Sequence, residues 1–138
     1  MLVTARAEYA CLAMLELASR YGDPKPIPLA EVTDKHGIPQ RFLVQILLQM
    51  KAAGLVTTTR GSSGGYQLAK SPEVITVADI MGVLDRLEEP DERSIAPSPM
   101  ATALQKVWKG LAKARSEYLD RYTLSELLPA SVELDYSI

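Results

Sequence analysis

The chain has 138 residues, of which 47% are hydrophobic, with 15 lysines and arginines against 17 aspartates and glutamates. This composition fits one compact domain, alone or with an appendage, and excludes a disordered or collagen-like chain. No stretch approaches the roughly 18 apolar residues of a membrane span, and Arg6 and Glu8 interrupt any secretory signal. We therefore expect a cytoplasmic protein with no membrane partner. The single cysteine and single histidine exclude an intrachain disulfide and a zinc site built from Cys and His alone.

The two halves of the chain differ in charge. Residues 1–70 carry 8 basic and 5 acidic side chains, whereas residues 71–138 carry 7 basic and 12 acidic ones. A mildly basic half can approach a polyanion while the acidic half meets solvent or protein. The overall acidic balance therefore does not exclude nucleic acid as a ligand.

Helical patterns dominate the N-terminal half. Residues 3–20 contain no glycine or proline, and their apolar side chains form a broad stripe at helical spacing after Thr4, a good N-cap. A short helix is predicted over residues 28–36, with Gly37 ending it in the left-handed conformation. The next helix is predicted from residue 39 to the glycine at position 54. Two helices joined by so short a turn predict a helix-turn-helix.

After its core positions are assigned, the second helix of this pair keeps a mixed polar and apolar face, which consists of Arg41, Val44, Gln45, Leu48, Gln49 and Lys51. Arginine and glutamine side chains read base edges in the major groove of DNA. The candidate DNA-binding residues on this helix are Arg41, Val44, Gln45 and Gln49.

A β-hairpin is predicted after the helix-turn-helix. Residues 55–59 and 66–69 form the strands, and the turn between them is rich in glycine and contains one arginine. An arginine on a pliable loop without bulky neighbours suits a narrow minor groove. The candidate DNA-binding residues of this wing are Arg60, Gly61, Ser62, Ser63, Gly64 and Gly65. The sequence thus predicts a mainly α fold with a small β-hairpin wing, a winged helix-turn-helix.

The C-terminal part begins with a helix that Thr76 is placed to cap and that packs back on the core. Residues 86–100, with four acidic residues and three prolines, predict a solvated loop. Residues 101–122 then repeat apolar side chains at alternating three- and four-residue steps, which is typical of paired helices. A dimerisation helix is expected, although packing on its own domain would leave the same pattern. The expected dimer contacts are Leu104, Val107, Trp108, Leu111, Arg115, Tyr118 and Tyr122.

Other candidate sites have simpler interpretations. Cys11 lies on the predicted buried face of the first helix, which favours a small apolar role over a redox sensor. His36 is placed to interact with a helix dipole or a phosphate. The glycine-rich turn lacks the lysine of a P-loop, and the acidic cluster lacks the ligand spacing of a metal loop. We therefore expect no catalytic residue, no metal and no enzyme; the alternative function is a winged-helix protein-interaction module that has lost DNA binding.

The wing carries the motif RGxxGGYxL from Arg60 to Leu68, which is far more specific than a lone glycine loop. Further residues that fit the same family pattern, in order along residues 1–85, are Tyr9, Ala10, Ala13, Met14, Leu15, Pro28, Leu29, Ala30, Gly37, Ile38, Leu43, Gly54, Leu55 and Val56. On these residues the sequence resembles the Rrf2 family of winged-helix transcriptional regulators.

The resemblance implies a homodimer, clasped by the long helix, that represses transcription from a pseudo-palindromic DNA operator. Cluster-binding members carry three cysteines before the dimer helix, whereas residues 86–105 contain none. The chain therefore resembles a clusterless branch without a cofactor. Three kinds of control stay open: a regulatory protein, a small-molecule effector, or no effector. We divide it into a DNA-binding domain (1–85), an acidic, proline-containing loop (86–100), and a dimerisation helix with a C-terminal tail (101–138).

Overall fold

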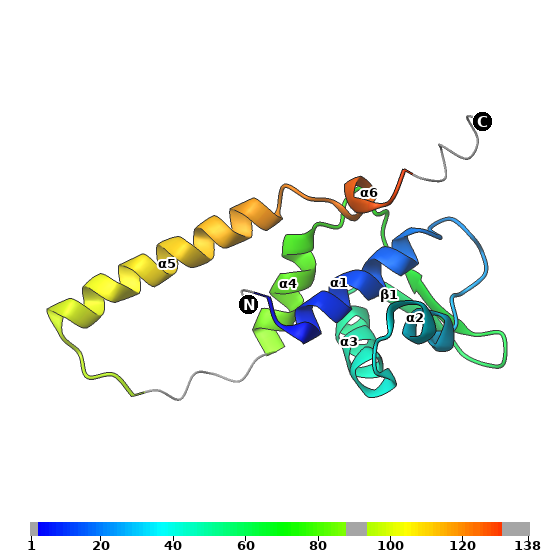
Figure 1. Cartoon of the computed structure of the whole chain (residues 1–138), viewed down its shortest axis with the longest axis horizontal. Helices are drawn as coiled ribbons and strands as arrows, with labels where there is room; N and C mark the ends of the chain where they lie inside the picture. Colours follow the sequence, from blue (N-terminus) through cyan, green and yellow to red (C-terminus); the bar gives the residue numbers. More distant parts are fainter. Residues whose placement is uncertain (1–2, 88–93, 131–138) are drawn as a thin grey trace.

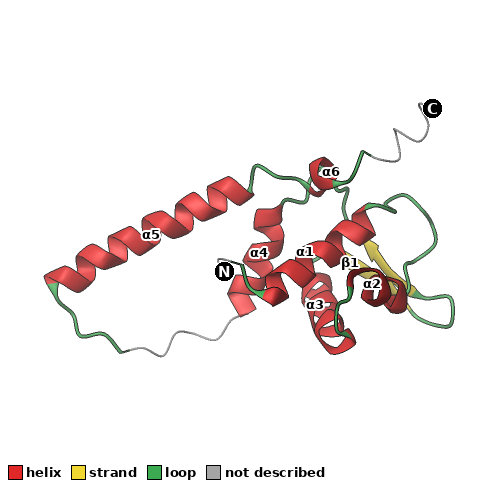
Figure 2. Cartoon of the chain, viewed as in Figure 1, coloured by secondary structure: helices red, strands yellow, loops and turns green. Residues whose placement is uncertain are grey.

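The computed structural model describes residues 3–87 and 94–130. It is mainly helical with one antiparallel hairpin, which confirms the predicted fold class (Figures 1 and 2). In chain order the elements are α1 (Ala5–Ala18), α2 (Leu29–His36), α3 (Gln40–Ala52), β1 (Val56–Thr59), β2 (Gly65–Leu68), α4 (Val77–Leu87), α5 (Pro99–Leu119) and α6 (Leu124–Leu127).

The predicted helix ends are present in the structure. The Thr4 hydroxyl accepts a hydrogen bond from the Ala7 N–H at 3.1 Å and caps α1. Gly37 ends α2 with φ at 65°, in the left-handed region. Thr76 caps α4 by accepting from the Asp79 N–H at 3.1 Å. These short-range signals fix where the helices of the winged helix begin and end.

The core lies where α1, α3, α4 and the hairpin meet. α1 packs against α3 and β2, and α2 packs against α3, so the helix-turn-helix rests on α1. Each fully buried Leu, Ile or Met side chain contributes about 1.5–3 kcal/mol of transfer free energy. The largest fully buried side chains are Met14, Leu17, Ile27, Val32, Leu43, Ile46, Leu47, Met50, Ile75, Ile80 and Leu124.

The hairpin is held to the rest of the domain by a third extended segment. β1 and β2 pair antiparallel, with Thr59 opposite Gly65. Ile27, just before α2, exchanges two backbone hydrogen bonds of 2.9 Å with Tyr66 on β2. The wing therefore keeps a fixed position relative to the helix-turn-helix.

The C-terminal segment differs in two ways from the prediction. α5 begins at Pro99 rather than residue 101, because the Ser98 hydroxyl caps it and proline fits the first helical position. It ends at Leu119, before Tyr122, because the chain turns back towards the core. There the Tyr122 carbonyl accepts from the Val77 N–H at 2.9 Å.

After this turn the chain contacts the winged helix again. Leu124 on α6 is fully buried among core residues, and its N–H donates to the Ile75 carbonyl at 2.9 Å. The sequence prediction grouped this segment with the dimerisation helix and tail, but the structure adds it to the N-terminal core. Residues 88–93 of the predicted acidic loop and 131–138 of the predicted tail lie outside the described residues.

Candidate nucleic-acid interface

The outward face of α3 is formed by residues opposite its core side. Leu43, Ile46, Leu47 and Met50 are buried, so the helix turns Arg41, Gln45 and Leu48 to the exterior, with Val44 half-buried beside them. Lys51 continues this face one turn further and is exposed. The outward face thus combines two cations, an amide and two apolar side chains.

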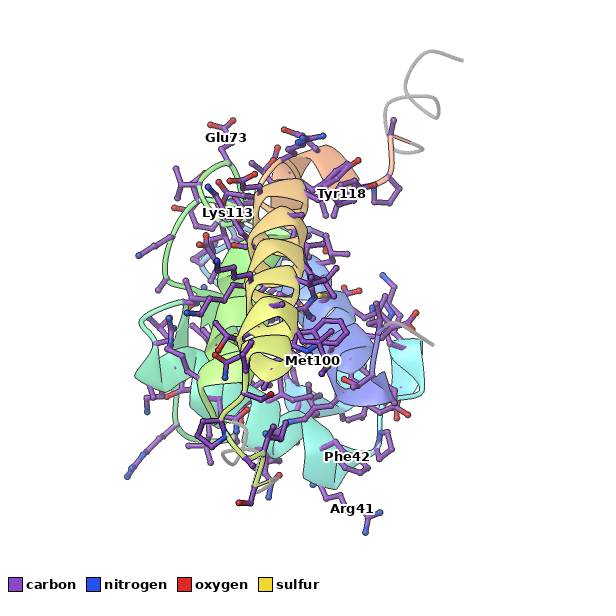
Figure 3. All side chains as sticks on the ribbon, turned by 90° about the vertical axis from the view of Figure 1, so that its left-hand side faces the viewer. Arg41, Phe42, Glu73, Met100, Lys113 and Tyr118 are labelled. Atoms are coloured by element: carbon purple, nitrogen blue, oxygen red, sulfur yellow. The ribbon has the colours of Figure 1, made fainter. Side chains whose placement is uncertain are left out.

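Arg41 lies over the ring of Phe42, which in turn lies near the ring of Tyr9. Its guanidinium carbon lies 4.9 Å from the centre of the Phe42 ring, and the Phe42 ring lies 6.1 Å from the ring of Tyr9 on α1. Figure 3 shows Arg41 extending outward beyond Phe42 at one end of the molecule. A cation over an aromatic face is attracted to the ring and restricted in its rotamers. The stack therefore connects the first turn of α3 to α1.

The turn of the wing needs glycine at three positions, one for its backbone conformation and two for lack of space. Gly61 has φ of 107°, which side chains rarely adopt, and its carbonyl accepts from the Gly64 N–H at 3.0 Å. A Cβ atom on Gly64 would lie 2.1 Å from the Thr59 carbonyl oxygen, and one on Gly65 would lie 2.3 Å from the Ile27 carbonyl oxygen. The glycines of the motif therefore close the turn, while Arg60 stays exposed at its start.

A groove of about 480 Å³ separates α3 from the hairpin. It brings together Val44 on α3 and the predicted wing residues Arg60, Gly61, Gly64 and Gly65. The other predicted DNA-binding residues, Arg41, Gln45, Gln49, Ser62 and Ser63, do not line it. Eight further residues line the groove that the sequence analysis did not select as DNA-binding, among them Leu48, Lys51 and Tyr66.

Helical spacing could have identified Leu48 as an interface residue, because it lies four residues after Val44 on the same helical stripe. Gln49, one residue later, is rotated by about 100° away from this stripe. It is half-buried, and its side-chain oxygen is buried without a hydrogen-bond partner in the described part of the chain. Gln49 therefore lies at the edge of the outward face rather than at its centre.

Glu16 on α1 contacts two basic side chains of α2. Its side chain is 4% exposed, and one carboxylate oxygen lies 3.0 Å from Lys35 Nζ and 2.9 Å from His36 Nε2, both on α2. Burial alone would raise the pKa of Glu16, but hydrogen bonds and charges from Lys35 and His36 outweigh it and lower the pKa. His36 thus contacts a carboxylate of its own chain, a contact that the sequence analysis did not anticipate.

Cys11 is partly buried against the core. Burial, followed by the charge of Glu8, raises the pKa of its thiol to about 11. The thiol is therefore protonated at neutral pH, and a thiolate is the reactive form of cysteine.

The apolar side of α5 is not covered by its own domain. No residue of this helix is buried, and Arg115 pairs with Asp85 on α4 at 3.1 Å. Figure 3 shows Met100 and Tyr118 on one side of α5 and Lys113 on the other. Tyr122, expected on the same surface, lies beyond the helix and is half-buried, with its hydroxyl donating to Tyr118 at 3.3 Å. The large exposed hydrophobic side chains of α5 are Met100, Leu104, Val107, Trp108, Leu111 and Tyr118.

None of the helices in residues 3–87 and 94–130 is long and apolar enough to cross a membrane. The same residues contain no group of three or more His, Cys, Asp or Glu side chains placed to hold a metal ion.

Comparison with known proteins shows which family this chain belongs to. Residues 3–130 match the Rrf2 family, described as "Iron-dependent Transcriptional regulator". The chain is 32% identical to protein rrf2 of Nitratidesulfovibrio vulgaris over 93% of this chain and 87% of that protein. It resembles the structure of IscR from T. potens with a TM-score of 0.71 and 31% identity, over 91% of this chain and 84% of that chain. It also resembles the structure of CymR, the global cysteine regulator of B. subtilis, with a TM-score of 0.70 and 31% identity, over 91% of this chain and 94% of that chain. The chain therefore belongs to the Rrf2 family of transcriptional regulators.

Proposed function

We propose that this protein is a homodimeric, sequence-specific DNA-binding repressor that works in the cytoplasm without an iron–sulfur cluster. The observation that carries the proposal is the position of the wing beside the outward face of α3, with Arg60 and Lys51 lining the same groove. In a winged helix-turn-helix the second helix enters the major groove. Regulators that use this arrangement need no catalytic residue, and we assign none here.

The proposed contacts fall into two classes. Lys51 and other cations position the protein on phosphates, which carries little sequence information. Arg41 and Gln45 read base edges in the major groove, and Arg60 enters the adjacent minor groove. Two copies joined through α5 would present two such surfaces to a pseudo-palindromic operator.

The family description mentions iron, but the cysteines of this chain do not support a cluster. Its single cysteine is Cys11 on α1, and residues 86–105 contain none. Because clusters are held by several thiolates, we infer that a regulatory protein or small-molecule effector controls DNA binding instead. The protein is expected to be colourless after anaerobic purification. A visible absorption band together with bound iron would contradict this inference.

The proposal is tested by fluorescence anisotropy with duplex DNA from upstream of the protein's own gene and with a scrambled duplex, each at two salt concentrations. Tight binding to the native duplex that weakens as salt rises is expected, with much weaker binding to the scrambled one. Arg60→Ala should weaken native binding and leave the fold and dimer unchanged. Arg86→Ala, an exposed arginine on α4, is the matched control.

The proposal would be contradicted if the native and scrambled duplexes bound weakly and equally, and if duplexes selected in vitro from a random pool also bound no better than the scrambled one. That result would favour the alternative function, a winged-helix protein-interaction module that has lost DNA binding.

A further inference from the structure

An exposed leucine occupies the centre of the α3 outward face. Leu48 is 60% exposed, and Val44, one turn earlier on the same stripe, is half-buried. Both side chains line the groove between α3 and the hairpin. A large apolar side chain exposed beside a groove is a feature of binding surfaces. We call Val44 and Leu48 the apolar pair.

Basic side chains surround the apolar pair. Arg41 lies seven residues before Leu48 on the same face and is exposed, Lys51 follows it by three residues, and Arg60 lies across the groove. No acidic residue lines this groove. A polyanion is the partner that complements such a rim, so the occupant we assign to this surface is duplex DNA.

We propose that the apolar pair reads the 5-methyl groups of thymine in the major groove, and this rests on the proposed function. Neither Val44 nor Leu48 has a side-chain donor or acceptor. The thymine methyl group is the one apolar group among the base edges of the major groove, where the other groups are donors and acceptors. A polar base edge packed against Leu48 would lose hydrogen bonds to water without replacement.

The structure restricts how the apolar pair can move away from the DNA. Leu47, next to Leu48, is fully buried, and the register of β1 and β2 with the Ile27–Tyr66 hydrogen bonds holds the wing opposite α3. If Arg60 occupies the minor groove, α3 cannot roll to turn Leu48 towards solvent. The apolar pair therefore selects thymine at positions flanking those read by Arg41 and Gln45.

The experiment uses the full chain and duplexes selected in vitro from a random pool. Each conserved thymine of a half-site is replaced in turn by deoxyuridine, which removes only the methyl group. At the thymine contacted by Leu48, deoxyuridine should raise Kd about three- to fourfold per half-site, the value expected for one buried methyl group. In Leu48→Ala the duplexes with thymine and with uridine at that position should bind equally.

Val74→Ala is the matched control, because Val74 is an equally exposed aliphatic residue, at 62%, outside α3 and the wing. It should keep the full difference between thymine and uridine. Circular dichroism checks that both variants are folded. If selected duplexes bind tightly but no uridine replacement matters, or Leu48→Ala keeps the difference, the apolar pair does not read methyl groups. Failure to select any duplex would instead overturn the proposed function on which this inference rests.

Discussion

At the scale of single residues, Glu16 is the one buried charged side chain among the described residues. It joins α1 to Lys35 and His36 on α2 and lies 3.7 Å from Arg20. We expect Glu16→Gln to lower the free energy of unfolding at pH 7 by about 2 kcal/mol, the range for hydrogen bonds to charged groups. Urea unfolding measures this difference.

The same contacts predict how this difference depends on pH. The folded-state pKa of Glu16 is lowered, so its contribution is fully present above the unfolded pKa, about 4.3, and is lost as pH falls through the folded pKa. The difference between wild type and Glu16→Gln should therefore shrink as pH falls from 5 towards 3. Glu31→Gln, which removes an exposed ion pair with Arg20, is the control and should change stability by less than about 1 kcal/mol. A difference that stays constant with pH would rule out this account of Glu16.

Phe42 is a positioning residue for Arg41. Its ring lies between the Arg41 guanidinium and Tyr9. Phe42→Leu should weaken operator binding by about two- to fivefold, the value of an exposed cation–π contact, and should reduce selectivity over a scrambled duplex. Phe42→Tyr keeps the ring and should bind as wild type does. Anisotropy titrations of both variants decide, and equal loss in the two would show that the ring itself is not what matters.

At the scale of elements, Gly64 and Gly65 let the hairpin backbone come close to the backbone at Thr59 and Ile27. Gly65→Ala would place a Cβ atom 2.3 Å from the Ile27 carbonyl oxygen, so the Ile27–Tyr66 hydrogen bonds must lengthen or break. We expect a loss of about 2 kcal/mol or more, since a steric clash that disrupts hydrogen bonds in the core is among the large mutational effects. Thermal unfolding followed by circular dichroism measures it.

Gly82→Ala is the matched control for this substitution. Gly82 lies inside α4, and a Cβ atom there would meet nothing within 4 Å. Alanine is favoured over glycine in a helix interior by about 0.5–1 kcal/mol, so Gly82→Ala should raise the melting temperature. If Gly65→Ala also melted at or above the wild-type temperature, the close approach of Gly65 to Ile27 would not be required for the fold.

Local signals were sufficient to predict most elements of the winged helix. Thr4, Gly37 and Thr76 act through hydrogen bonds or backbone preferences within a few residues, so their roles can be recognised in the sequence. The Ile27–Tyr66 pairing and the burial of Leu124 join segments far apart in the chain, and no local pattern encodes them. The candidate interface follows the same division. Helical spacing identified its outward face, including Leu48, but only the packing of α3 shows that Gln49 is half-buried at the edge of that face.

At the scale of the whole molecule, α5 is attached to the winged helix near its C-terminal end but is uncovered along its apolar side. The Arg115–Asp85 pair and the Tyr122–Val77 hydrogen bond attach it to α4, and Leu124 anchors the chain just beyond it. Its exposed apolar residues therefore keep a defined direction in each copy. In the proposed dimer, a second copy would cover the same surface by two-fold symmetry. Dimer formation is thus expected to need no refolding of the winged helix.

Trp108, the only tryptophan of the chain, provides a direct test of this dimer. It is 57% exposed on the apolar side of α5, so pairing should bury it and move its fluorescence emission to shorter wavelength. On dilution the emission should shift to longer wavelength as dimers dissociate, in parallel with a halving of the mass in sedimentation equilibrium. Leu111→Asp should give the monomer mass and the long-wavelength emission at every concentration, because a carboxylate cannot be buried there unpaired. Lys109→Asp, on the opposite side of the helix, should remain dimeric. A Leu111→Asp protein with the dimer mass and short-wavelength emission would place the dimer contact elsewhere on the molecule.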